Sequence, residues 1–336
     1  MAGLQKPVIA ITMGDPCGIG PEVISKALAH KEVYEACRPV VIGNSWCMEQ
    51  AVELTGRTLR VREVESPSAA GLSPEQVDVV DIHNLNPEDV TVGEISPACG
   101  KAAMEWVTRA AELAIAGQVN ALATAPINKE AASLAGYKSI GHMELLQEIS
   151  GSSDVATMLM TGQLRVVHLT THRSLRRACD YVTKEGILAK LALTHHSFTS
   201  WGVSSPRIGV AALNPHGSDG GLLGNEEAEE ISPAVQEARS RGIDAYGPVP
   251  ADIVFHQAIQ GAYDVVLAMY HDQGHIPVKV YGFEKSITAN LGLPFVRTSV
   301  DHGTAFDIAG KGIADEDSML EAINLAVSLS LGNGLF

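Results

Sequence analysis

Three histidines in the chain each closely follow a short apolar run. They are His172 after residues 164–169, His216 after residues 207–213 and His271 after residues 264–269. Such runs predict buried strands, and open α/β sheets bind ligands at the carboxyl ends of their strands. Neutral imidazole is a common ligand of divalent metals, and three protein ligands with an open position suit a catalytic ion. The positions together predict a metal site, although each histidine taken alone would more often be structural and no short motif such as His-Glu-x-x-His is present.

Cationic side chains elsewhere in the chain could bind an anion. Lys279 and Arg297 flank the segment that ends in LGLPFVRT. Arginine binds a carboxylate or phosphate bidentately, whereas lysine acts as a point charge. His142 begins a helical pattern, and the N-terminus of a helix can receive an anion. In a chain with a net charge of −15 these groups are candidate substrate anchors; the alternatives are surface salt bridges and an ordinary helix cap.

The glycine-rich segments exclude two common nucleotide-binding folds. GDPCGIGPE lacks the full G-x-G-x-x-G pattern, and no Gly-Lys-Ser/Thr completes a P-loop. The segment 301–318, DHGTAFDIAGKGIADEDS, is instead rich in Gly, Asp and small residues. Such a loop allows close approach of the backbone to a ligand, and the alternative is a plain turn.

Apolar runs alternate with helical patterns along the chain, which is typical of an α/β fold. Strands are expected at residues 7–13, 38–43, 121–125, 207–213 and 264–269, with a hairpin formed by 158–160 and 164–169. Helices are expected to begin at Pro21, to span 96–116 and to close the chain at 319–331.

Composition limits the class of protein. Lys plus Arg number 24 and Asp plus Glu number 39, and this acidic balance argues against binding nucleic acid or an anionic membrane. The five cysteines are widely spaced and contain no Cys-x-x-Cys, which indicates a reducing compartment without a disulfide framework or a thiolate zinc site. No stretch approaches a signal peptide or a membrane span, so we expect a soluble cytoplasmic protein.

Several of these motifs together resemble a known family. The segments ITMGDPCGIGPE, TAPINKEA, GHMELL, THRSLR, LNPHGSDGG, GPVPAD, LAMYHDQGHIPVK and LGLPFVRTSVDHGTAFDIAG run nearly from end to end of the chain. They resemble the 4-hydroxythreonine-4-phosphate dehydrogenases of bacterial vitamin B6 (pyridoxine) biosynthesis. The last segment is also similar to the loop that holds the adenosine part of NAD in isopropylmalate and isocitrate dehydrogenases.

The resemblance implies a two-lobed α/β fold of the isopropylmalate dehydrogenase type, with the active site in the cleft between the lobes. Residues 1–127 and 281–336 would form the cofactor-side lobe, and residues 128–280 the lobe for substrate, metal and dimerisation. The implied enzyme is an oxidatively decarboxylating dehydrogenase that uses NAD or NADP and one divalent ion (Zn, Mg, Co or Mn). It would be a homodimer with its active site at the subunit interface.

The resemblance also implies roles for individual residues. The metal would be held by His172, His216 and His271, with ligands drawn from both chains of the dimer. Substrate contacts are implied at His142, Met143, Lys279, Thr288 and Arg297. Cofactor contacts are implied at Asp301, His302, Gly303, Thr304, Ala305 and Asp307. Lys279 and Asp252 are the candidate catalytic residues, with Lys279 either an anion anchor or a proton donor.

Two substrate positions depart from the family pattern, because Met143 stands where the family has Thr and Thr288 where it has Asn. A site built to bond a polar group rejects analogues that lack it, so these changes bear on the choice of substrate. His275 makes the chain look more like relatives that oxidise 4-phospho-D-threonate or 4-phospho-D-erythronate. Both substrate classes stay open.

A metal-dependent hydrolase or lyase without nicotinamide is the alternative of another class, and the segment HGTAFDIAG argues against it. A catalytically silent binding protein is a third alternative, against which the intact histidine set argues.

Overall fold

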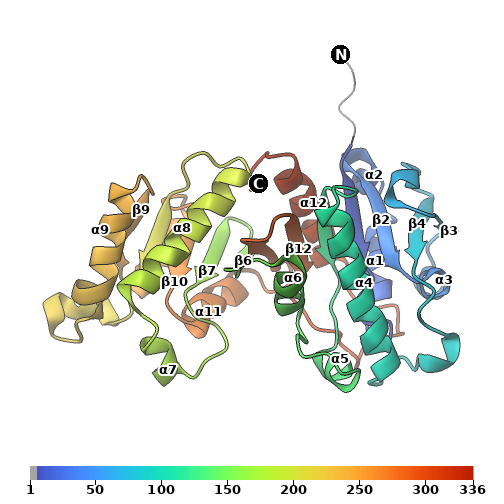
Figure 1. Ribbon diagram of the computed structural model, residues 1–336, viewed down its shortest axis with the longest axis horizontal. Helices are drawn as coiled ribbons and strands as arrows, with labels where there is room; N and C mark the ends of the chain where they lie inside the picture. The colour runs from blue at the N-terminus through green and yellow to red at the C-terminus, as the bar shows by residue number, and fades with distance from the viewer. Residues whose placement is uncertain (1–5, 336) are drawn as a thin grey trace, which may run out of the picture. The chain divides into compact units, whose positions relative to one another are not determined.

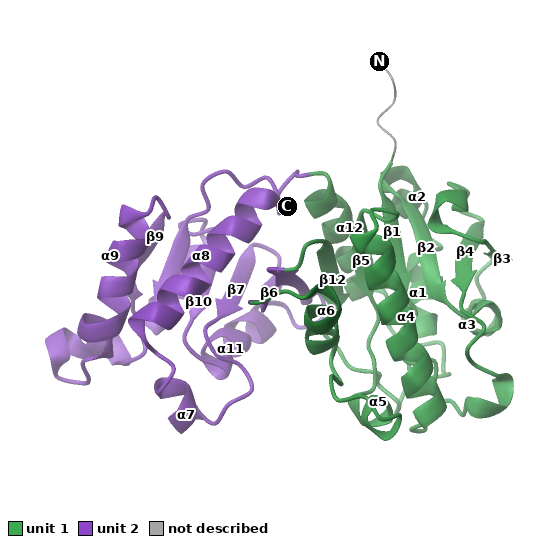
Figure 2. Cartoon of the chain, viewed as in Figure 1, with its two compact units in different colours: residues 1–153, 293–331 green, residues 154–292, 332–336 purple. Residues whose placement is uncertain are grey.

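The apolar runs become the central strands of two α/β units in the computed structural model, which describes residues 6–335. Unit 1 contains the chain up to Ser153 and Leu293–Leu331, and unit 2 contains Asp154–Gly292 and the segment from Gly332 (Figure 2). No helix in the described part of the chain is long and apolar enough to cross a membrane.

Unit 1 has a parallel sheet in the order β3-β4-β2-β1-β5-β12. Its strands are β1 (Val8–Thr12), β2 (Arg38–Gly43), β3 (Arg60–Glu63), β4 (Gln76–Asp81), β5 (Ala121–Thr124) and β12 (Val296–Val300). β1 and β5 are buried along their whole length, because helices cover the sheet. Parallel strands buried in this way consist of nearly continuous apolar residues, which is why the sequence predicts them.

The helices of unit 1 pack on this sheet and on one another. They are α1 (Gly20–Ala27), α2 (Lys31–Ala36), α3 (Ser45–Leu54), α4 (Pro97–Ile115), α5 (Lys129–Leu134), α6 (His142–Ser150) and α12 (Asp317–Ser330), with short 3-10 turns at Pro67–Ala69 and Pro87–Asp89. Figure 1 shows the long helix α4 in front of the strands. The Ser96 hydroxyl caps α4 by accepting from the Cys99 N–H, and Pro97 occupies its first turn.

Unit 2 has a mixed sheet in the order β11-β6-β7-β10-β8-β9. Its strands are β6 (Ala156–Thr161), β7 (Leu164–His168), β8 (Ile208–Ala211), β9 (Ala245–Val249), β10 (Val265–Ala268) and β11 (Ile287–Leu291). β6 pairs antiparallel with β7 and β11, whereas β7, β10, β8 and β9 are parallel. Gly162 has φ +51° in the turn between β6 and β7, so the predicted hairpin is confirmed.

The helices of unit 2 are α7 (Leu175–Cys179), α8 (Lys184–Ser200), α9 (Ser232–Ser240), α10 (Ala251–Ile259) and α11 (His271–Gly282). A turn at Pro215–Gly221 and a π-helical turn at Glu227–Ile231 lie between β8 and α9. α10 and α11 both contact β7 and β10. Val254 and Phe255 of α10 and Val278 of α11 share one core with Val166 and Val266, so that α11 is anchored with its first residue, His271, at the end of β10.

The unit boundaries differ from the expected boundaries at 127/128 and 280/281. α5 and α6 pack against α4, so residues 128–153 belong to unit 1. β11 pairs with β6, so residues 281–292 belong to unit 2. These boundaries follow from packing and strand pairing between distant segments, which local patterns do not reveal. The functional roles assigned to the two lobes stay predictions.

Candidate active site

Two of the three candidate metal ligands lie near each other in unit 2. His172 follows β7, and His271 is the first residue of α11, directly beyond β10, which is parallel to β7. Their ring centroids are 6.1 Å apart. Both histidines line a cavity of about 320 Å³ together with Arg173, Tyr270 and Asp272. Parallel pairing of β7 and β10 therefore brings two strand-end imidazoles to one cavity.

His216 lines a second cavity of about 320 Å³, which it shares with Asp252, Tyr270 and Gln273. Tyr270 lines both cavities, so the two are adjacent. Within residues 6–335 the three histidines do not form a group whose ligand atoms all lie within 4.8 Å of one another. A single chain thus presents two of the imidazoles together and the third beside them.

The backbone around His216 adopts a left-handed conformation that few side chains tolerate. His216, Ser218 and Asp219 have φ values of 54°, 71° and 46°. The Glu227 carboxylate holds the base of this turn by accepting hydrogen bonds of 2.7 Å from Asn214 N and 2.8 Å from Leu213 N. Strain of this kind concentrates at ligand-binding and catalytic positions.

Two further histidines, His168 and His275, lie next to His271. The rings of His271 and His275 stack with centroids 3.6 Å apart. His275 Nδ1 lies 3.1 Å from the His271 carbonyl oxygen and 3.1 Å from His168 Nε2. Burial lowers the pKa of His168 to about 3, and the neighbouring histidines add to the shift, so His168 is neutral at physiological pH. His271 Nδ1 also lies 2.6 Å from Asp272 Oδ1, so its ring is held from two sides.

In unit 1, Arg297 is a buried cation with a fixed orientation. Its side chain on β12 is 5% exposed. Nε and Nη2 both donate to Thr124 Oγ1 on the adjacent strand β5, at 3.1 and 2.6 Å. Burial lowers the pKa of Arg297 to about 9, so the guanidinium keeps its charge at neutral pH. A buried arginine is well suited to binding a carboxylate or phosphate.

His142 lies at the start of α6, within the influence of that charge. Burial, and then the positive charges of Arg297 and Lys129, hold the pKa of His142 well below its usual range. In the described part of the chain, its buried Nε2 atom has no hydrogen-bond partner. The neutral imidazole and the guanidinium therefore offer an anion two different kinds of polar group. Met143 follows in the first turn of α6 and is half-buried.

Lys279 and Thr288 lie on neighbouring elements of unit 2. Lys279 Nζ donates to Ser286 Oγ at 3.0 Å and lies 4.8 Å from the ring centroid of Phe283. Thr288 is in β11 opposite Leu159 of β6 and is 7% exposed. Strand pairing therefore fixes the backbone at residue 288, so a substitution there changes the side chain without moving the strand.

The loop 301–310 packs closely on the loop of the GDPCGIG segment. Ile19 N donates to Thr304 O at 3.0 Å. A Cβ atom on Gly18 would lie 2.7 Å from that same oxygen, so only glycine fits there. Ala305 has φ +44°, and His302 Nδ1 lies 3.0 Å from the Gly303 carbonyl oxygen. The backbones of the two loops are therefore in direct contact.

A cavity of about 410 Å³ lies beside these loops. Its lining residues come from the first loop, α1, α3, the segment around residue 91 and the end of the later loop: Pro16, Gly18, Pro21, Glu22, Trp46, Cys47, Gln50, Ala51, Leu54, Val90, Val92, Ala309 and Gly310. A mostly apolar cavity with a few polar groups is typical of a small-molecule site. The only signal for it in the sequence is the glycine-rich character of the two loops.

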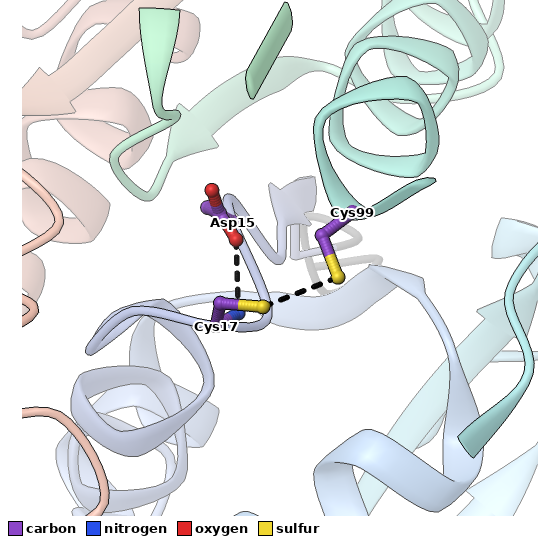
Figure 3. Close-up of side chains that lie close together, drawn as sticks. All are labelled: Asp15, Cys17 and Cys99. Atoms are coloured by element: carbon purple, nitrogen blue, oxygen red, sulfur yellow. Dashed lines mark hydrogen bonds between the residues drawn. The ribbon is translucent and has the colours of Figure 1, made fainter. Parts of the chain in front are cut away.

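Figure 3 shows a buried cluster formed by Asp15, Cys17 and Cys99. The Cys17 N–H donates to Asp15 Oδ1 at 2.8 Å, and the Cys17 thiol donates to the Cys99 sulfur at 3.3 Å. Burial raises the pKa of Asp15 to about 6, and its Oδ2 atom has no partner among the described residues. Cysteine spacing in the sequence gives no sign of this cluster, since residues 17 and 99 are brought together only by folding. A more exposed group with comparable spacing consists of Glu63, Asp81 and His83.

Comparisons with known proteins show which proteins the chain resembles in sequence and fold. Residues 35–326 match the family model described as pyridoxal phosphate biosynthetic protein PdxA. The chain is 46% identical over 325 residues to the D-threonate 4-phosphate dehydrogenase of Cupriavidus necator, covering 96% of this chain and 97% of the relative. The structure of 4-hydroxythreonine-4-phosphate dehydrogenase from Klebsiella pneumoniae is similar with a TM-score of 0.91, 42% identity and coverage of 98% of this chain and 99% of that one. The enzyme of the same name from Burkholderia phymatum gives a TM-score of 0.87, 44% identity and coverage of 97% and 99%. The expected α/β fold is thereby confirmed.

Proposed function

This chain belongs to the PdxA family, and we propose that it oxidises a 4-phosphorylated 3-hydroxy acid with NAD(P) and then decarboxylates the product. Dehydrogenase activity follows from the family, whereas the substrate, the metal dependence and the decarboxylation are proposed. The proposal rests on the buried Arg297 guanidinium, whose positive charge helps to lower the pKa of His142 and so keeps that imidazole neutral. Arg297 and His142 would bind an anionic group of the substrate, the guanidinium through charge and the imidazole through a hydrogen bond.

The three strand-end histidines fit the proposed metal by the chemistry of their donors. His172, His216 and His271 carry imidazoles, a donor type that suits zinc and other divalent transition metals. The bound ion would lower the pKa of the substrate hydroxyl and polarise the resulting ketone. His275 and Asp272 would keep the His271 ring in one orientation, which is the usual task of groups behind a metal ligand. The identity of the metal stays open among Zn, Mg, Co and Mn.

The loop 301–310 and the cavity beside it are the proposed cofactor site. Asp301, His302, Gly303, Thr304, Ala305 and Asp307 are the proposed contact residues. Ala309 and Gly310 of the same loop line the 410 Å³ cavity, which supports its use by the adenosine half of the cofactor. NAD or NADP bound there would supply the hydride acceptor, and the protein would position it against the substrate.

Oxidation of the alcohol β to a carboxylate gives a β-keto acid. Loss of CO₂ from it leaves an enolate, which must take up a proton on carbon. Lys279 is the proposed donor or, alternatively, an anchor for the substrate anion; Ser286 holds its ammonium group in place. Asp252, in the cavity of His216, is the second proposed catalytic residue.

For the substrate we favour 4-phospho-D-threonate over 4-hydroxythreonine 4-phosphate. The Met143 thioether is at most a weak hydrogen-bond acceptor, and Thr288 carries one hydroxyl where an amide would offer more. A pocket with these residues binds an amino-acid ammonium group less well than one with Thr and Asn. The name of the Cupriavidus necator relative supports the same choice.

An exposed apolar row supports the proposed homodimer. Ile276, Val280 and Phe283 follow one face of α11 and its end at helical spacing, and they are 59%, 82% and 69% exposed. Apolar side chains gathered in this way mark interaction surfaces. α11 also carries His271 and Lys279, so a partner seated on this row would lie next to candidate site residues. Static light scattering of the purified chain tests the dimer.

A substrate panel tests the proposed function. Absorbance at 340 nm is followed with NAD or NADP, a divalent metal, and either 4-phospho-D-threonate, 4-phospho-D-erythronate or 4-hydroxythreonine 4-phosphate. We expect reduction of the cofactor with release of CO₂ for at least one substrate. Turnover of substrate without cofactor reduction would instead favour the hydrolase or lyase alternative.

A further inference from the structure

Cys17 and Cys99 are two thiols in direct contact inside unit 1. Both side chains are 0% exposed, and their sulfur atoms are 3.3 Å apart. Cys17 lies in the loop between β1 and α1, whereas Cys99 lies in the first turn of α4. A disulfide needs a sulfur–sulfur distance of about 2.05 Å, so its formation would require the loop to move Cys17 roughly 1 Å toward Cys99.

The two thiols differ in acidity in the way that a reactive pair requires. The Cys17 hydrogen bond lowers the pKa of Cys99 and raises the pKa of Cys17. The first turn of a helix also favours negative charge, and a thiolate, not a thiol, attacks an oxidant. Cys99 is therefore the attacking sulfur and Cys17 the one that resolves the product.

We propose that Cys17 and Cys99 are a reversible redox site, which a hydroperoxide converts into a disulfide. The Cys99 thiolate attacks one peroxide oxygen, so that an S–O bond forms, the O–O bond breaks and hydroxide leaves to become water. The Cys17 sulfur then attacks the sulfenic sulfur of Cys99, so that an S–S bond forms and the S–O bond breaks. The proton of Cys17 leaves with the oxygen as a second water. One hydrogen peroxide thus consumes two thiols and yields two waters.

The 410 Å³ cavity is lined by chain neighbours of Cys17 and of a residue that contacts Cys99, so we infer that a small oxidant approaches the pair from there. Pro16 and Gly18, on either side of Cys17, line this cavity. Val90 and Val92 line it too, next to Asp89, whose carbonyl oxygen lies 3.5 Å from the Cys99 sulfur. The wall between the cavity and the thiols is therefore formed by residues adjacent to them in the chain.

Formation of the disulfide should also affect cofactor binding, because Pro16 and Gly18 line the cavity proposed for the cofactor. A disulfide draws Cys17 toward α4 and moves Pro16 and Gly18 with it, which changes the shape of the cavity. We expect the oxidised enzyme to have a KM for NAD raised several-fold, with kcat changed less. This second part rests on the proposed function, because it takes the cavity to be the cofactor site.

A bound metal ion is the competing explanation for the cluster. Structural zinc takes four ligands in tetrahedral geometry. Asp15, Cys17 and Cys99 supply three, and one oxygen of Asp15 is already bonded to the Cys17 N–H. Among the described residues no fourth protein ligand joins this group, so the set for a structural zinc ion is incomplete. The incomplete ligand set favours the dithiol.

Treatment of the reduced full-length enzyme with hydrogen peroxide tests the redox site. The denatured protein should lose two of its five titratable thiols, and mass spectrometry should find the peptides of Cys17 and Cys99 linked. Dithiothreitol should restore both the thiols and the KM for NAD. Cys17→Ala and Cys99→Ala should each prevent the link and the kinetic change. Cys37→Ala, which removes another buried thiol of unit 1, should prevent neither.

Three outcomes would overturn parts of this inference. The redox site is wrong if peroxide leaves Cys17 and Cys99 unlinked in the wild-type chain, or if the purified protein holds one zinc ion that Cys99→Ala releases. A link that leaves every kinetic constant unchanged would overturn the effect on the cavity. If the reduced enzyme reduces neither NAD nor NADP, the proposed function fails, while the peptide link still decides the redox site.

Discussion

Thr124 and Arg297 lie on adjacent parallel strands, and the threonine hydroxyl accepts hydrogen bonds from both Nε and Nη2 of the guanidinium. Ser299, two residues beyond Arg297 on β12, lies 2.9 Å from the same hydroxyl. One side chain of β5 therefore fixes the direction of a buried cation of β12. Two of its nitrogen atoms are thus held in place by one neutral hydroxyl group.

Thr124→Val should weaken substrate binding while keeping the shape of the side chain. The Nε and Nη2 atoms of the buried guanidinium lose the acceptor that they share, and an unsatisfied buried donor costs about 1–3 kcal/mol. We expect KM for the phosphorylated substrate to rise roughly tenfold or more, which steady-state kinetics measures. Thr298→Val is the matched control, because its hydroxyl bonds to the carbonyl oxygens of Leu122 and Ala322 instead. It should lower stability without a comparable rise in KM.

Replacement of each candidate metal ligand should abolish activity without unfolding the chain. His172→Ala, His216→Ala and His271→Ala remove half-buried or exposed imidazoles, so circular dichroism should be unchanged. His256→Ala, which removes an exposed histidine on α10, should stay active. Full activity of the wild-type enzyme after exhaustive EDTA treatment would contradict the metal requirement.

A bulky side chain introduced into the loop 301–310 should weaken binding of the cofactor. Ala305→Trp should raise KM for NAD far more than KM for substrate, because the large ring prevents close approach of the cofactor. Ala305→Gly is the control. At φ +44° glycine is less strained than alanine, so this variant should bind NAD normally and be as stable or more stable. Equal effects of Ala305→Trp on both KM values would argue against a cofactor role.

Met143 and Thr288 should determine which substrate the enzyme prefers. We expect kcat/KM to be higher for 4-phospho-D-threonate or 4-phospho-D-erythronate than for 4-hydroxythreonine 4-phosphate. Met143→Thr combined with Thr288→Asn should shift this ratio toward the amino acid. One charge-assisted hydrogen bond of about 1.5–3 kcal/mol corresponds to roughly ten- to over hundredfold in kcat/KM. A tenfold or greater preference of the wild-type enzyme for the amino acid would make these two residues the wrong determinants.

Asp15 should make stability depend on pH in the weakly acidic range. Its pKa rises from 3.8 to about 6 on folding, so the native state binds the proton more tightly than the unfolded state. The stability this contributes is fully present below pH 3.8 and is lost as the pH rises through 6. Asp15→Asn removes the charge and keeps an acceptor for Cys17 N–H. It should therefore raise the free energy of unfolding above pH 6 by up to about 3 kcal/mol, as urea titrations at several pH values would measure. No difference between the two proteins at pH 8 would contradict the raised pKa.

Much of the fold is determined locally and could be predicted. β1, β2, β5, β8 and β10 coincide with predicted apolar runs, because strands buried on both faces leave little place for polar residues. The closing helix predicted at 319–331 is observed as α12, Asp317–Ser330. β3 carries no such signal, because its residues are half-buried or exposed. The strand-end positions of His172, His216 and His271 could likewise be inferred, because a strand and the residues beyond it are local features.

What the sequence by itself determined is thus the element types, the strand-end chemistry and the family resemblance. The tertiary structure alone decided which distant residues meet. Cys17 and Cys99 are 82 positions apart, His168 and His275 are 107 apart, and Thr124 and Arg297 are 173 apart. It also decided the unit boundaries, because β11 belongs with β6 only through pairing. The physical reason is that apolar periodicity and capping act over a few neighbouring residues. Contacts between distant strands and loops depend instead on how the strands are arranged side by side in the folded sheets.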